Sequence, residues 1–356
     1  MQKSPAPKEK LLRRKVSFLF TLNVIAITVV IVILLSRIGL PENLEEHKAI
    51  QYISPAAESI SMEQVFLTEY QFTRPLLLSD VNKESDNFKT LKSNLNRLIE
   101  HSKQNGTASS VSVYLRKLKN GEWIDINGRE GYNPGSLLKV PVLITYLKQA
   151  EKNPELLEIE VLFDRMNVTI PAQTYGGKSI EQGKKYKVKD LLYYMAVHSD
   201  NYATTLLTQL MDRTPLVEKD AYQKFFSDLE IIKSDVYDRN LSITVSEYSK
   251  FMRILYSASY LNPKDSEYAL SLLAQGDFKE GLLKQLPPDV KIAHKFGEYG
   301  TEAEKQLHET GIIYAGSDAY LLTIMTKGND IKLLPEVLSE ISKHVYDYMT
   351  GGKTNI

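Results

Sequence analysis

Residues 135–144 read GSLLKVPVLI, and the expected fold is built outward from this stretch. Proline is tolerated in an α-helix only near the first turn, because it lacks an amide hydrogen and its ring clashes with the preceding turn. Pro141 therefore predicts a helix that begins close to Ser136 and continues to Ala150. On such a helix Ser136 and Lys139 lie one turn apart on the same face.

Two later motifs supply the other polar groups that an acyl-transfer site needs. Ser199-Asp200-Asn201 offers a second hydroxyl and a side-chain amide, and Lys295-Phe296-Gly297 offers a second amine followed by a glycine. A lysine among apolar residues has a lowered pKa, so part of it can act as a neutral base. Each motif alone also fits a helix cap, a solvent-facing lysine or a turn. Together, in this order, they predict serine acyl transfer without histidine or metal.

This order of motifs resembles the penicillin-recognising serine enzymes, and within them the class A β-lactamases, over roughly residues 87–349. The resemblance implies an α/β fold of the β-lactamase and transpeptidase type. Such a fold has an antiparallel sheet from N- and C-terminal segments, packed with helices, beside an all-helical lobe. The resemblance also implies three catalytic residues and four that bind substrate: Ser136, Lys139 and Ser199, and Asn201, Lys295, Gly297 and Glu298.

The resemblance assigns each of these residues a role. Ser136 is the nucleophile, Lys139 its general base or electrostatic organiser, and Ser199 relays a proton to the leaving nitrogen. Asn201 hydrogen-bonds Lys139 and the substrate amide, Asp200 faces away, and Lys295 binds a substrate carboxylate. Backbone amides of Ser136 and Glu298 form the oxyanion hole. Gly297 lets a substrate backbone lie against the strand edge.

The chain departs from the class A pattern at two places. Phe296 stands where the family has a threonine or serine hydroxyl that helps hold a penicillin carboxylate. Residues 231–241 occupy the place of the loop whose glutamate activates the deacylating water, and they contain no glutamate. Asp235 or Asp238 could substitute, although both also fit a turn. Without a positioned base, an acyl-enzyme forms and then persists.

Three functions follow as hypotheses. The first is a β-lactamase-like hydrolase acylated by a β-lactam or related amide, with weak deacylation. The second uses the same site on cell-wall peptides, as a D,D-peptidase or transpeptidase. The third is a non-catalytic wall-binding module, which has no need to retain both hydroxyls and both amines.

No cofactor and no metal are expected. The six histidines show no H-x-x-x-H spacing. We expect surface or packing roles for His198 and His308, and we expect His294 to point to the strand face opposite Lys295.

The pattern of apolar residues predicts strands near both ends of the domain and helices between them. The expected strands are 110–118, 122–126, 290–297, 310–314 and 319–326. The expected helices are 88–101, 139–150, 191–211, one that starts at 242–245, and 334–349. The helix 191–211 is expected to be interrupted at 199–201.

Composition excludes several partners. Lys plus Arg and Asp plus Glu both number 44, so no overall field attracts nucleic acid. The absence of cysteine excludes disulfides and thiolate catalysis.

The N-terminus predicts a membrane anchor. A basic tail (1–15) precedes an uncharged, largely apolar run (16–36), and about 20 such residues suffice to cross a bilayer. A buried core helix and a cleaved signal peptide are the alternatives. The basic flank predicts a single-pass protein of the cell membrane with its N-terminus in the cytoplasm. A stalk (37–86) then leads to an extracytoplasmic catalytic domain (87–356).

Overall fold

The computed structural model describes residues 72–73, 84–164, 170, 173–231, 235–236, 238, 240–316 and 318–351. The predicted tail and anchor, and most of the predicted stalk, lie outside these residues. Among the residues described, no helix has both the length and the apolar character needed to cross a bilayer.

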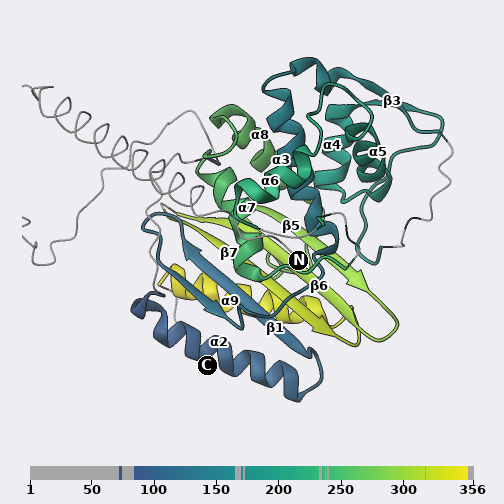
Figure 1. The fold of residues 1–356 in the computed structure, drawn as a ribbon. Coiled ribbons are helices and arrows are strands. Elements are labelled where there is room, and N and C mark those ends of the chain that lie inside the picture. Colours follow the sequence, from purple (N-terminus) through teal and green to yellow (C-terminus); the bar gives the residue numbers. More distant parts are fainter. Residues whose placement is uncertain are drawn as a thin grey trace, which may run out of the picture. The chain divides into compact units, whose positions relative to one another are not determined.

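Strands from both ends of the domain form one antiparallel sheet in the order β2-β1-β7-β6-β5 (Figure 1). Its strands are β1 (Ser110–Lys117), β2 (Trp123–Ile126), β5 (Lys291–Gly300), β6 (Lys305–Ala315) and β7 (Asp318–Gly328). The middle residues of β1, β6 and β7 are buried on both faces, because helices cover both sides of the sheet. This arrangement confirms the predicted sheet. A separate pair joins β3 (Glu160–Leu162) to β4 (Lys185–Lys187).

Helices from opposite ends of the domain cover one face of the sheet. They are α2 (Lys89–Gln104), which follows the short helix η1 (Asp86–Phe88), and α9 (Leu334–Met349). Leu91, Leu95 and Ile99 recur at helical spacing and join the same buried cluster as Leu338 and Ile341. Burying each such side chain contributes roughly 1.5–3 kcal/mol. The periodicity that predicted α2 is therefore the stripe that packs toward the sheet.

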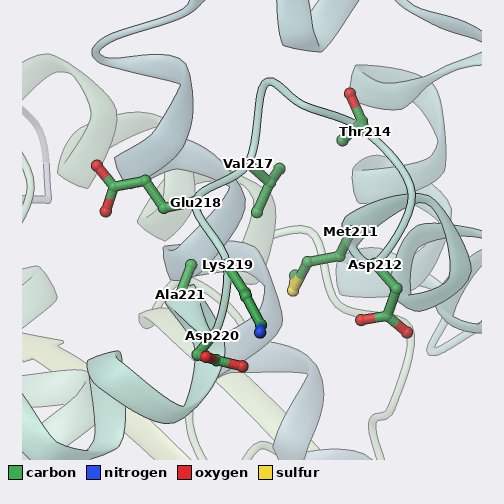
Figure 2. Close-up of a pocket in the computed structure, with 8 residues that line it drawn as sticks. All are labelled: Met211, Asp212, Thr214, Val217, Glu218, Lys219, Asp220 and Ala221. Carbon is green, nitrogen blue, oxygen red and sulfur yellow. The ribbon is translucent and has the colours of Figure 1, made fainter.

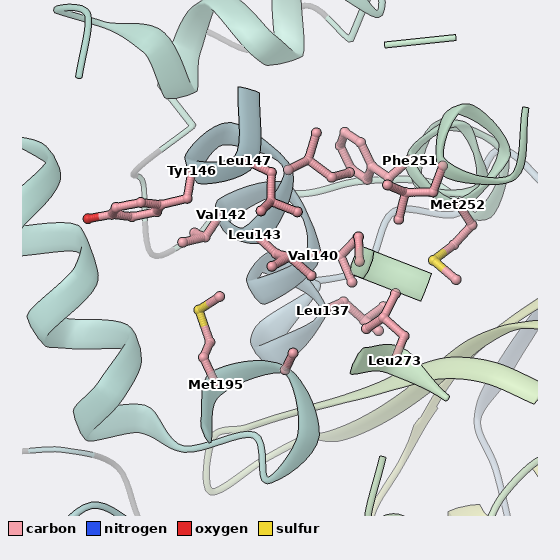
Figure 3. Close-up of a cluster of buried hydrophobic side chains, with 14 of the residues drawn as sticks. Leu137, Val140, Val142, Leu143, Tyr146, Leu147, Met195, Phe251, Met252 and Leu273 are labelled. Atoms are coloured by element: carbon pink, nitrogen blue, oxygen red, sulfur yellow. The ribbon is translucent and has the colours of Figure 1, made fainter. Parts of the chain in front are cut away.

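The remaining helices cover the other face and form the helical lobe. They are α3 (Lys139–Ala150), η3 (Pro154–Glu158), α4 (Val188–Val197), α5 (Asn201–Met211), α6 (Ala221–Asp228), α7 (Val245–Tyr256) and α8 (Pro263–Leu273). Every side chain of α3 except Lys148 is buried, as expected for a helix that is apolar all round. Figure 3 shows Leu143 and Leu147 of α3 among side chains of other helices, including Met195 and Phe251. The first residue of this central helix, Lys139, is consequently buried as well.

The predicted helices are present, and the S-D-N motif separates α4 from α5. The helices α6 and α8 and the β3–β4 pair were not predicted. The start of α8 carries a readable signal, because the Asn262 side chain accepts the Asp265 amide and Pro263 begins the helix. The strands β3 and β4 are three residues each, too short for a period-two pattern to emerge.

Candidate active site

A single 3-10 turn, η2 (Gly135–Leu138), carries Ser136 and leads directly into α3. Gly135 has a φ of +52°, in the left-handed region that favours glycine. A Cβ at Gly135 would lie 2.3 Å from the carbonyl oxygen of Glu298 on β5. The turn and the strand are therefore in backbone contact, which brings together the two segments expected to supply the oxyanion hole.

Gly297 makes the same contact from the strand side. A Cβ there would lie 2.5 Å from the Pro134 carbonyl oxygen and 2.7 Å from the Leu137 amide nitrogen. Gly297 was expected to leave room for a substrate backbone, and the backbone that lies against it in the structure is the turn that carries Ser136.

The Lys139 amine is surrounded by four oxygen atoms. Its Nζ lies 2.7 Å from Ser136 Oγ and 2.7 Å from Asn201 Oδ1. It also lies 2.7 Å from the carbonyl oxygen and 3.0 Å from the hydroxyl of Ser199. An ammonium has only three hydrogens for these four acceptors. As a neutral amine, Lys139 can donate its two hydrogens to Asn201 and the Ser199 carbonyl and accept the Ser136 hydroxyl proton on its lone pair.

The electrostatics of the site favour that neutral form. Burial, and then the charge of Lys295, lower the pKa of Lys139 well below its usual value, against opposing effects of Asp200 and Glu298. Burial also lowers the pKa of Lys295 to about 7, while Glu309 and Glu298 oppose this change. Both amines consequently lose positive charge far below the pH at which a solvated lysine would.

The S-D-N motif directs Ser199 and Asn201 to Lys139, and Asp200 to the backbone of neighbouring segments. Ser199 has a φ of +55°, uncommon for a residue with a side chain, and both of its oxygens lie within hydrogen-bonding distance of Lys139. Asp200 caps α5 by accepting the Tyr202 amide at 2.9 Å, and it also accepts the Ile180 amide at 2.9 Å. The carboxylate of Asp200 is thus engaged by the backbone, and Asn201 opens α5.

Lys295 is held by the residue that follows it. Its Nζ donates to the Phe296 carbonyl at 3.0 Å and lies 4.2 Å from the centroid of the Phe296 ring. That ring stacks on Phe278 with centroids 4.6 Å apart. The side chain that replaces the family's hydroxyl therefore makes a cation–π contact with the lysine meant to bind substrate.

Sequence reasoning missed a loop that reaches the site. Gln173 Nε2 donates to the Ser199 carbonyl at 3.0 Å, and it lies 3.4 Å from Asn201 Oδ1 and 3.5 Å from Ser136 Oγ. The next amide, Thr174 N, donates to the Glu298 carboxylate at 2.8 and 3.1 Å. Burial raises the pKa of Glu298, and hydrogen bonds from this loop oppose that change. No local pattern signals a contact between residues so distant in sequence.

The three histidines near the motifs, His198, His294 and His308, are buried. His294 Nδ1 lies 2.6 Å from the buried Glu309 carboxylate, away from the Ser136 site. His308 hydrogen-bonds a backbone carbonyl at 2.9 Å, and burial lowers its pKa to about 4. His198 contacts Asp277. These positions agree with the packing roles expected for them.

The loop that lacks the glutamate contributes no buried acid in its described part. Asp235 and Asp238 are both exposed. Asp238 accepts the Asn240 amide at 2.8 Å, as an aspartate does in a turn.

The described residues also contain no cluster of three or more acidic or histidine side chains that could hold a metal ion. A pocket of about 420 Å³ lies elsewhere in the helical lobe, between the end of α5 and the start of α6 (Figure 2). None of the residues assigned to the Ser136 site lines it.

An antiparallel sheet between helices, a helical lobe, and a serine and lysine in contact where the central helix begins define the fold class of the penicillin-recognising serine enzymes. The model of the β-lactamase enzyme family matches residues 90–349. The chain belongs to this family.

Solved structures agree with this assignment. A β-lactamase from Chitinophaga pinensis is 17% identical with a TM-score of 0.61, covering 72% of this chain and 99% of its own. The protein PBP-A is 18% identical with a TM-score of 0.61, covering 79% and 99%. A PBP-A variant, solved as an acyl-enzyme with penicillin G, is 18% identical with a TM-score of 0.60, covering 74% and 97%. At these identities the likeness establishes the fold. No curated protein sequence matches the chain.

Proposed function

We propose that this protein is a serine acyl-transfer enzyme that is acylated at Ser136 by a β-lactam or a related amide and releases the acyl group slowly. The observation that carries the proposal is the buried Lys139 amine, 2.7 Å from Ser136 Oγ and fixed by Asn201 and Ser199. A surface lysine that merely happened to be near a serine would have neither the burial nor the surrounding acceptors.

Attack begins with proton transfer from Ser136 to the neutral Lys139 amine. The freed Oγ electron pair forms a bond to the substrate carbonyl carbon, and the carbonyl oxygen becomes an oxyanion. We assign the backbone amides of Ser136 and Glu298 to receive that charge, and such donors typically contribute a factor of about 10²–10³ in rate. The amines and amides of the site thus serve the transition state more than the ground state.

Collapse of the tetrahedral intermediate breaks the bond to the leaving nitrogen, which must gain a proton. Ser199 Oγ lies 3.0 Å from Lys139 Nζ. The proton that Lys139 took from Ser136 can therefore pass through the Ser199 hydroxyl to the leaving nitrogen. The products are an ester at Ser136, an amine and a regenerated neutral lysine; an acyclic amide releases the amine, whereas a β-lactam keeps it attached to the acyl group.

Release of the acyl group needs a base that activates water, and general-base assistance is worth about 10²–10⁴ in rate. Residues 231–241 contain no glutamate, and the two aspartates of this loop are exposed. We therefore expect the acyl-enzyme to accumulate.

A D,D-peptidase or transpeptidase acting on cell-wall peptides is the second candidate. The loop without a glutamate favours it over an efficient β-lactamase, because an acyl-enzyme that is released slowly is the behaviour of a penicillin-binding peptidase. The likeness to PBP-A, a variant of which forms a penicillin G acyl-enzyme, is compatible with this candidate.

We also propose that residues 16–36 anchor the protein in the cell membrane with the domain outside the cytoplasm.

The experiment uses the full chain in detergent with a fluorescent penicillin and, separately, a chromogenic cephalosporin. We expect a stable fluorescent adduct and little cephalosporin turnover. Ser136→Ala should abolish the adduct, whereas Ser93→Ala, an exposed serine on α2, should not change it. Rapid turnover without an adduct would support an efficient β-lactamase. No adduct, together with no hydrolysis of either β-lactam or of a peptide ending in D-Ala-D-Ala, would reject both enzymatic candidates.

A further inference from the structure

Glu298 brings a carboxylate into the Ser136 site. Thr174 N donates to both of its oxygens, at 2.8 and 3.1 Å. The neighbouring Gln173 reaches Asn201 and Ser136 from the same loop. The negative charge of Glu298 opposes the lowering of the pKa values of Lys139 and Lys295 that burial causes. The carboxylate is thus close enough to interact electrostatically with Lys139, the expected base, and with Lys295, the cation expected to bind the substrate carboxylate.

Lys295 is poorly placed to compensate for that charge. Its ammonium is buried, donates to the Phe296 carbonyl and lies over the Phe296 ring. Burial lowers its pKa to about 7, so it holds its proton far less firmly than a solvated lysine does. The attraction of Lys295 for a substrate carboxylate is therefore reduced, and the nearby Glu298 carboxylate repels the same group.

The consequence depends on the charge of the substrate. Penicillins and peptides ending in a free carboxyl carry an anion close to the scissile amide. At an effective dielectric constant of about 20, the repulsion between two like charges about 4 Å apart is large, and even at about twice that separation it changes a rate by tenfold or more. A neutral or cationic group at the same place avoids this repulsion.

Building on the proposed acyl transfer at Ser136, we infer that Glu298 is a specificity-determining residue whose side chain disfavours acyl donors with an anionic group beside the scissile amide. The substrates it favours are amides with a neutral or cationic group there, such as an internal peptide bond. This role belongs to the carboxylate and is separate from the oxyanion hole, which uses the backbone amide.

The test compares benzylpenicillin with its methyl ester, which share a β-lactam ring and differ in one charge. Acylation rate constants of the full-length protein are measured by intact-protein mass spectrometry. Glu298→Gln keeps the shape and an oxygen that can accept from Thr174. It should raise the acid-to-ester rate ratio by about tenfold or more. Glu302→Gln, with the same charge change at an exposed position beyond β5, should leave the ratio unchanged.

A second measurement needs no variant. After each rate is divided by the compound's reactivity with hydroxide, the wild-type protein should favour the ester by about tenfold or more. An acid that reacts as fast as the ester, or a Glu298→Gln ratio within twofold of wild type, would overturn the inference while leaving acyl transfer intact. Failure of both probes to form any adduct would instead reject the proposed function, and the inference with it.

Discussion

Replacing Lys295 by methionine should stabilise the protein at low pH, although it removes a polar contact. The pKa of Lys295 falls from 10.5 to about 7 in the folded state, with burial as the main cause. The folded protein therefore binds fewer protons than the unfolded chain between these values, so its stability rises with pH across this interval. Below pH 7 the full cost of the buried amine is present, about 5 kcal/mol.

Methionine removes that cost but also the hydrogen bond to Phe296 and the cation–π contact, worth about 1 kcal/mol each. We expect a net gain of about 2–3 kcal/mol at pH 6 that disappears by pH 10. Urea unfolding, followed through Trp123, the single tryptophan, measures both values. Trp123 stacks on Tyr114 at the edge of the sheet, so its fluorescence reports when the sheet unfolds.

The exposed Lys284→Met is the matched control, and its stability should stay within about 0.5 kcal/mol of wild type at either pH. A Lys295→Met protein that is less stable than wild type at pH 6, or a difference that does not vary with pH, would refute the reasoning.

Three further predictions follow from the same structure. Gly135→Ala should destabilise the protein by several kcal/mol and slow acylation at least about 100-fold, because its Cβ would meet the β5 backbone. Thermal unfolding measures the loss of stability, which should be only about 1 kcal/mol for the control Gly106→Ala, where no atom lies within 4 Å. Glu267→Gln should weaken the hydrogen bond that the Thr73 amide donates to the Glu267 carboxylate at 2.8 Å, at a cost of about 1–2 kcal/mol. Limited proteolysis near residue 73 should then be faster, and unchanged cleavage would contradict this prediction. The acylation rate should rise with pH and level off well below pH 10.5, because burial lowers the pKa of Lys139 and the neutral amine is the base; stopped-flow acylation that keeps rising beyond pH 10 would exclude that role.

Local sequence signals were sufficient for the centre of this fold. Pro141 and the apolar run after Ser136 marked the buried helix and its start. The helix also explains why Lys139 is buried, since a residue at its first position cannot reach solvent when nearly every following side chain is packed. The cap formed by Asp200 follows from a residue type that favours helix starts.

Contacts between distant segments could not be read in this way. Thr174 meets Glu298 across 124 positions, and the loop that carries it has no hydrophobic period. From the sequence, Phe296 was interpreted only as the loss of the threonine or serine hydroxyl that the class A pattern has at this position. Its contact with Lys295 depends on how the edge strand presents consecutive side chains, which no spacing rule specifies. The same holds for Gly297, where the neighbour is the protein's own turn.

Peptide mapping of the penicillin-treated protein tests the central claim most directly. The proteolytic fragment that contains Ser136 should carry one intact acyl group, and the modified fraction should persist for many minutes after excess penicillin is removed. An acyl group on any other residue, or turnover of penicillin with Ser136 unmodified throughout, would contradict attack by Ser136 and slow release.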